Sequence, residues 1–118
     1  MNIVDPKMIK KMARALKCGD NLYDLHDIDT ALKQGHMQGH VEGDTWAVTQ
    51  VQQFPKRKAV NVLFVVGSLE NSLKLEAKVE AWAKDIGADL LMAVGRGGWW
   101  QFRTPGWRMI GTLYSKDI

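Results

Sequence analysis

The sequence has little cysteine and little proline: Cys18 is the single cysteine, and there are three prolines in 118 residues. One cysteine excludes an internal disulfide framework and a cysteine-rich metal site, and it is typical of a reducing compartment. No apolar run approaches the roughly 18 residues that a membrane-spanning helix needs. Lysines interrupt the N-terminal segment where a signal peptide would have its apolar core. We therefore expect a soluble intracellular protein that is not secreted through a signal peptide.

The sequence also lacks a strong excess of either charge. Sixteen basic residues face 13 acidic ones, which gives a net charge of +3, whereas a dedicated nucleic-acid-binding domain usually has a denser basic surface. A chain of this length has room for one hydrophobic core. We therefore expect residues 1–118 to form a single domain, which excludes most two-domain enzymes, such as full-size dehydrogenases and kinases.

Two helices are predicted before the first strand. Asp5 can cap the first, Pro6 suits its first position, and Gly19 can end it. Its basic face is either a stripe that binds an anion or a partner, or a solvated surface. The second helix is predicted within Tyr23–Gly35, with Asp27 as its cap.

Two histidines follow, and their spacing is the one feature that could indicate a metal. His36 and His40 are four residues apart, so on a helix they could share a metal ion. The glycines around them argue against a helix, and no third ligand has a matching spacing. We predict no metal site, and instead a short strand or loop with exposed histidines.

A hairpin is predicted next. Thr45–Phe54 has strand character, with Trp46 and Val48 on one face. Pro55–Lys58 is a basic turn, and Ala59–Gly67 is almost continuously apolar and rich in β-branched residues. This pattern predicts an antiparallel pair whose second strand is central and covered on both faces.

A βαβ unit follows from the next segments. A long helix is predicted from about Glu70 to Ile86, with Gly87 as its C-terminal cap, and a second apolar strand at Leu90–Val94. Two strands joined through a helix by short links lie side by side and parallel. Alternation over Trp107–Ser115 predicts a last strand. The fold class is therefore α/β: two N-terminal helices and a mixed, mainly antiparallel sheet with one βαβ unit.

A glycine-rich loop, Gly95–Gly98, follows the second apolar strand. It matches neither the phosphate loop of nucleotide hydrolases nor the dinucleotide-binding fingerprint. Its backbone amides and Arg96 could bind an anion or a carboxylate, or the glycines could form a β-bulge and turn in which Arg96 pairs internally. Ser68 lies outside any Gly-x-Ser-x-Gly frame, and no catalytic residue is predicted from spacing.

Aromatic and basic residues crowd the C-terminal part of the chain. Such interleaving could stack on nucleobases, plug the end of a small sheet, or form a protein interface, where Trp and Arg are enriched. The candidate interaction residues are Arg96, Trp99, Arg103 and Trp107.

The second half of the chain carries a family resemblance. The long helix ends in Val-Glu-Ala-Trp-Ala-Lys-Asp-Ile-Gly-Ala (Val79–Ala88), and an apolar strand, Gly95–Trp99, Pro105–Trp107 and a closing segment that reaches Lys116 follow. In this order and spacing, these pieces resemble small tailed-phage proteins of the GNAT (N-acetyltransferase) fold. The resemblance covers about Thr45–Ile118.

This resemblance implies a GNAT-like sheet in which two neighbouring parallel strands splay apart. In active members of the family, acetyl-CoA enters the gap: its pantetheine pairs with the strand corresponding to Asn61–Gly67, and its pyrophosphate lies on amides at the start of the long helix. Carried over to this chain, the cofactor-binding residues would be Val66, Gly67, Ser68 and Asn71, if acetyl-CoA binds.

The chain departs from the active pattern at that loop. Ser68–Lys74 has none of the glycines that let the backbone approach the phosphates, and Glu70 has the wrong charge. Trp99, Trp100 and Phe102 occupy the region where active members often have a tyrosine as general acid. The fold therefore carries over better than the chemistry.

We expect from this a GNAT-fold phage protein that is non-catalytic, has no cofactor, and is located in the host cytoplasm or the virion. It would act through protein contacts, with other virion subunits or a host factor as partners. Two alternatives stay open: an acetyl-CoA-dependent N-acetyltransferase with an atypical phosphate loop, and a nucleic-acid-binding module. The sequence does not predict the oligomeric state.

Overall fold

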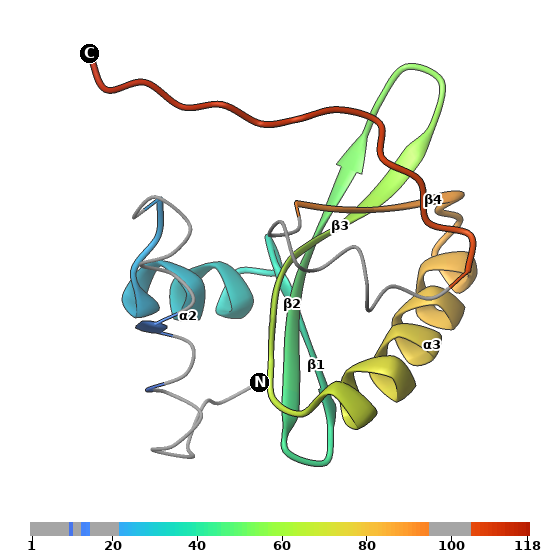
Figure 1. Ribbon diagram of the computed structural model, residues 1–118, viewed down its shortest axis with the longest axis horizontal. Coiled ribbons are helices and arrows are strands. Elements are labelled where there is room, and N and C mark those ends of the chain that lie inside the picture. The colour runs from blue at the N-terminus through green and yellow to red at the C-terminus, as the bar shows by residue number, and fades with distance from the viewer. Residues whose placement is uncertain (1–9, 11–12, 15–21, 95–104) are drawn as a thin grey trace.

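The computed structural model of the protein describes residues 10, 13–14, 22–94 and 105–118. Among these residues, four strands form one sheet in the order β1-β2-β3-β4, and two helices pack against it (Figure 1). The elements are α2 (Leu25–Lys33), β1 (Gln38–Glu42), β2 (Thr45–Gln53), β3 (Lys58–Val66), α3 (Leu69–Asp85) and β4 (Leu90–Ala93). The pairs β1–β2 and β2–β3 are antiparallel and β3–β4 is parallel. The predicted mixed, mainly antiparallel sheet is therefore confirmed.

The predicted second helix is α2, although its cap differs from the predicted one. The carboxylate of Asp24 accepts a 2.8 Å hydrogen bond from the amide of Asp27, and the carboxylate of Asp27 accepts one of 3.0 Å from the amide of Asp24. This reciprocal pair makes Asp24 the cap and puts Asp27 three residues inside it. The first predicted helix falls outside the described residues, apart from Lys10, Ala13 and Arg14, which are helical.

The histidine segment forms β1, as the prediction of a short strand allowed. His36 is exposed, but His40 is half-buried, so its predicted exposure is wrong. The His40 ring packs edge-on against Trp82 of α3, with ring centroids 4.8 Å apart, and its Nε2 lies 2.9 Å from the Thr49 hydroxyl. In the part of the chain that the structure describes, no three potential metal ligands come together.

The predicted hairpin is confirmed as β2 and β3, and it contains a bulge. Val48 pairs with Phe64 while Thr49 pairs with Val62, so Leu63 is an extra residue in β3. Leu63 and Phe64 both pack on the α2 side of the sheet. A bulge of this kind bends its strand, and here it lies at the sixth of the nine residues of β3.

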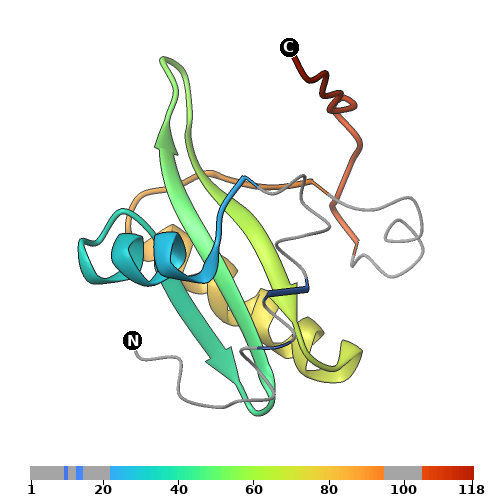
Figure 2. The ribbon, with the colours of Figure 1, turned by 90° about the vertical axis from the view of Figure 1, so that its left-hand side faces the viewer.

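The two helices cover opposite faces of the sheet, which confirms that the central strands are covered on both sides (Figure 2). The α2 side buries one cluster of side chains: Ile28, Met37, Trp46, Val48 and Val66. The α3 side buries a second cluster: Ala47, Val60, Leu75, Val79, Ala83 and Ala88. Trp82 packs against this second cluster.

The βαβ unit is confirmed as β3, α3 and β4. Helix α3 begins after Ser68, slightly earlier than predicted, and Gly87 follows its end with a φ of 84°. Strand β4 pairs with β3 over four residues, from Ala59–Leu90 to Val62–Ala93. Within the described residues, no helix is long and apolar enough to cross a membrane.

The predicted last strand, Trp107–Ser115, is wrong. Residues 107–118 have no regular secondary structure, and the segment leads away from the sheet (Figure 1). Alternating apolar residues make a strand only when a neighbouring strand supplies hydrogen-bond partners. Met109, Ile110, Leu113 and Tyr114 are 70 to 86% exposed, so this alternation has no core to face within the described chain.

Candidate functional site

A cavity of about 240 Å³ opens between β3, β4 and α3. The β3–β4 ladder ends at Val62–Ala93, whereas β3 continues to Val66. The bulge at Leu63 lies at the level where the ladder ends. We call this cavity the slot; its lining includes Leu63, Val65, Leu73, Leu91, Val94 and Trp107.

The slot is mainly apolar and carries few groups that could do chemistry. Ser72 and Glu76 are the polar residues of α3 that line it. The Trp107 indole N–H donates to the carboxylate of Glu76, which ties the chain to α3 just before the C-terminal segment, residues 108–118. Trp107 is the one candidate interaction residue that the structure places. Arg96, Trp99 and Arg103 lie outside the described residues, and the stacking and anion-binding alternatives built on them stay predictions.

The chain enters α3 through a tight junction beside the slot. Gly67 has a φ of +136°, and a Cβ there would lie 2.2 Å from the Thr45 hydroxyl and 2.6 Å from the Thr45 Cα. The Ser68 amide donates to the same hydroxyl at 3.1 Å. Ser68 then caps α3, its own hydroxyl accepting from the Asn71 amide at 3.3 Å. Only glycine fits position 67, and this close approach fixes where α3 begins.

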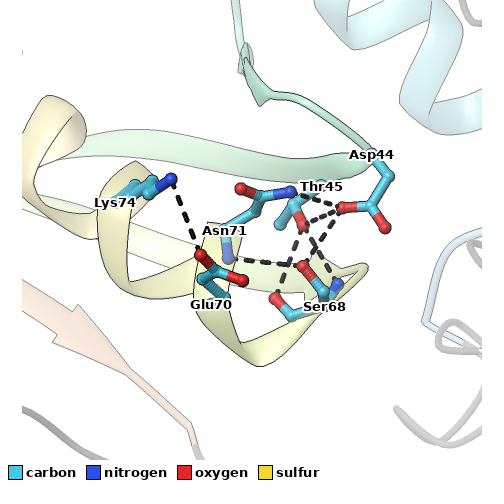
Figure 3. Close-up of polar contacts among 6 residues, drawn as sticks. All are labelled: Asp44, Thr45, Ser68, Glu70, Asn71 and Lys74. Atoms are coloured by element: carbon cyan, nitrogen blue, oxygen red, sulfur yellow. Dashed lines mark hydrogen bonds and ion pairs between the residues drawn. The ribbon is translucent and has the colours of Figure 1, made fainter.

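A carboxylate of the chain itself lies on this N-terminal turn. Asp44, from the turn between β1 and β2, accepts hydrogen bonds through Oδ1 from Asn71 Nδ2 at 2.8 Å, from the Thr45 hydroxyl at 3.0 Å and from the Ser68 hydroxyl at 3.2 Å (Figure 3). These hydrogen bonds hold the pKa of Asp44 below its ordinary 3.8, and the bond from Asn71 has the largest effect. Asp44 is therefore ionised at neutral pH.

A second carboxylate lies in the same turn. Glu70 is exposed, and its oxygen lies 3.8 Å from the Lys74 ammonium (Figure 3). Asp44, Glu70 and Lys74 together make the start of α3 net negative. A helix N-terminus carries a partial positive charge that favours a nearby anion. Here two carboxylates of the chain itself, those of Asp44 and Glu70, lie beside that charge.

The four predicted cofactor-binding residues are close together in the structure. Val66 ends β3 and is almost fully buried, and Gly67, Ser68 and Asn71 form the junction with α3. Nothing in the structure tests whether they bind acetyl-CoA. Asp44 was not predicted from the sequence, because its contact partners Ser68 and Asn71 lie 24 and 27 residues further along the chain. The Gly43–Asp44 pair indicates a turn, but no local pattern shows which helix that turn approaches.

No family model and no curated protein sequence matches the chain. Solved structures do match it. The whole chain superposes on 98% of a probable acetyltransferase with a TM-score of 0.68 and 9% sequence identity.

Two further structures are similar. A point mutant of a protein from Thermus thermophilus gives a TM-score of 0.57 at 17% identity, over 98% of each chain. A tetramutant of a protein from Bacillus halodurans gives 0.59 at 12% identity, over 95% of this chain and 89% of that one. At these identities the likeness concerns the fold alone, which is acetyltransferase-like.

Proposed function

We propose that this protein is a non-catalytic member of the acetyltransferase-like fold that does not use acetyl-CoA and acts through protein contacts. The observation that carries the proposal is the Asp44 carboxylate on the first turn of α3. In the family that the sequence resembles, the pyrophosphate of acetyl-CoA lies at the start of this helix.

The residues at this place do not fit a pyrophosphate. The Ser68 hydroxyl and the side-chain amide of Asn71 are donors that could bind phosphate oxygens, and both donate to Asp44 instead. Asp44 and Glu70 add two negative charges where the ligand would bring its own. Like charges at close range oppose binding, and the Gly67 junction is closed by contact with Thr45.

The slot also offers little for acyl transfer. A general acid or base must reach the reacting atoms from within hydrogen-bond distance. Of the two polar residues of α3 that line the slot, Glu76 already accepts from Trp107. No catalytic residue is proposed.

Exposed apolar surface supports a role in protein contacts. Val65, Leu69 and Leu73 line the slot and are 42 to 53% exposed. The C-terminal segment adds further exposed apolar side chains. Exposed apolar side chains grouped around one opening, as Val65, Leu69 and Leu73 are, are typical of interaction sites. The resemblance to tailed-phage proteins suggests a virion subunit or a host protein as partner.

Thermal unfolding with acetyl-CoA tests the proposal. A ligand at 100 times its dissociation constant stabilises the folded state by about 2.7 kcal/mol, which shifts Tm by several degrees in a domain of this size. We expect no shift at millimolar acetyl-CoA. A reproducible, concentration-dependent rise in Tm would overturn the proposal.

A second candidate is an acetyl-CoA-dependent N-acetyltransferase with an atypical phosphate loop. The observation that favours it is the slot itself, which opens where the resemblance places the pantetheine, beside β3. Under this alternative the same experiment gives the Tm rise, and mass spectrometry of candidate amine substrates would then reveal the acceptor.

A further inference from the structure

The C-terminal segment, residues 108–118, has the alternating apolar residues of a strand, but it pairs with no strand among the described residues. In an extended conformation it would present apolar residues on both faces. Five of its side chains are at least 70% exposed: Met109, Ile110, Leu113, Tyr114 and Ile118. Both views show the segment leading away from the sheet and from α3 (Figures 1 and 2). Apolar side chains left in water favour any arrangement that buries them.

The end of β3 offers an apolar strand edge that such a segment could pair with. Beyond the Val62–Ala93 pair, the β4 side of Leu63–Val66 has no ladder partner among the residues described. The slot beside this edge has an apolar mouth, where Val65, Leu69 and Val94 are 44 to 69% exposed. Such an edge readily accepts an extended segment as an additional strand.

The position of Trp107 argues for a second copy as the source of that strand. Trp107 lines the slot and is hydrogen-bonded to Glu76, and from it the chain leads outward. A segment that leaves its own domain at the slot can reach the slot of another copy without releasing this anchor. Each copy then offers both the segment and the edge, as a two-fold symmetric contact requires.

The sequence of the segment fits an interior strand. Met109 and Leu113 would point to one face of the sheet and Ile110 and Tyr114 to the other, and both faces beside β3 carry apolar clusters. Strands covered on both faces carry apolar residues on both sides in this way. The segment also carries two basic residues against one acidic residue, which complements the negative start of α3.

We propose that the protein forms a dimer in which residues 108–114 of each copy insert as a strand along Leu63–Val66 of the other. The partner is thus a second copy of this chain. The proposal rests on the proposed function in one respect, namely that the slot receives protein rather than acetyl-CoA.

Analytical ultracentrifugation of the full chain tests the dimer. We expect a species of twice the 13.3 kDa chain mass that dissociates on dilution. Leu113→Asp should raise the dissociation constant about tenfold or more, because it buries a charge in the contact. Leu22→Asp is the matched control: Leu22 and Leu113 are 70% and 72% exposed, and the control should leave the dissociation constant unchanged.

Amide hydrogen exchange shows where the contact lies. Leu63–Val66 and residues 108–114 should become protected as the protein concentration rises, and Leu113→Asp should abolish this protection. A chain that stays monomeric, equal effects of the two leucine variants, or protection that does not depend on concentration would each overturn the proposal. A monomer that does not bind acetyl-CoA would overturn the dimer and leave the proposed function intact. Acetyl-CoA that binds to the dimer while Leu63–Val66 stays protected would contradict the proposed function alone, and acetyl-CoA that removes this protection would overturn both.

Discussion

The side-chain amide of Asn71 in α3 donates a 2.8 Å hydrogen bond to the carboxylate of Asp44, 27 residues earlier in the chain. This bond ties the β1–β2 turn to the first turn of α3. It also places a negative charge at the positive end of that helix. The same contact carries our proposal that the start of this helix does not accept a pyrophosphate.

Replacing Asp44 by Asn should lower the stability of the fold. The amide that replaces the carboxylate accepts fewer and weaker hydrogen bonds from Ser68 and Asn71 and loses the favourable interaction with the helix dipole. We expect Tm to fall by a few degrees in thermal unfolding followed by circular dichroism. Asp85→Asn is the control, since Asp85 is exposed at the C-terminal end of α3 and its removal should be neutral or slightly stabilising. Equal losses in the two variants would show that Asp44 has no special role.

His40 should make stability depend on pH. Burial lowers the pKa of His40 below its ordinary 6.5, so the unfolded chain binds more protons at this residue than the folded chain does. Its contribution is therefore present above about pH 6.5 and is lost as the pH falls through the lower folded pKa. We expect the Tm of the wild type to drop between pH 7 and pH 5, and part of this drop to disappear in His40→Gln.

The control for His40 is His36→Gln, because His36 is exposed just before β1. This variant should keep the pH dependence of the wild type. If His40→Gln kept it as well, another group would be responsible for the acid sensitivity.

Gly67→Ala should be among the most damaging substitutions to alanine. At a φ of +136° a side chain is strained, and the new Cβ would meet the Thr45 side chain and backbone at 2.2 to 2.7 Å. We expect a loss of more than about 2 kcal/mol in the free energy of unfolding, measured by urea denaturation. Gly35→Ala separates the two causes, because Gly35 also has a positive φ, +77°, but nothing lies within 4 Å of its Cβ position. A cost of about 1 kcal/mol is expected there, and equal costs at both glycines would contradict the close approach to Thr45.

Much of the fold could be predicted because its signals are local. The apolar run of β3, the turn before it and the helix up to Gly87 each predict one element, and short links leave one arrangement for β3, α3 and β4. The hairpin and the βαβ unit were therefore predicted correctly. The bulge at Leu63 was not predicted, because a regular strand and a strand with one extra residue can both have a continuous run of apolar residues.

The errors and omissions concern contacts between distant segments. The half-burial of His40 depends on Trp82, 42 residues away, and the role of Asp44 depends on α3. The alternation over Trp107–Ser115 was interpreted as a strand, but the described part of the chain gives it no neighbour. Local patterns show what a segment can form, and the partners available to it decide what it does form.

The most direct test is an isothermal titration of the wild-type protein with acetyl-CoA, with the double variant Asp44→Asn, Glu70→Gln measured in parallel. We predict no heat of binding for the wild type, because two of its own carboxylates, those of Asp44 and Glu70, lie at the start of α3. Weak binding that appears only in the double variant would show that these two charges exclude the ligand. Saturable, one-to-one binding of acetyl-CoA to the wild type would contradict the proposal that this fold acts here without its cofactor.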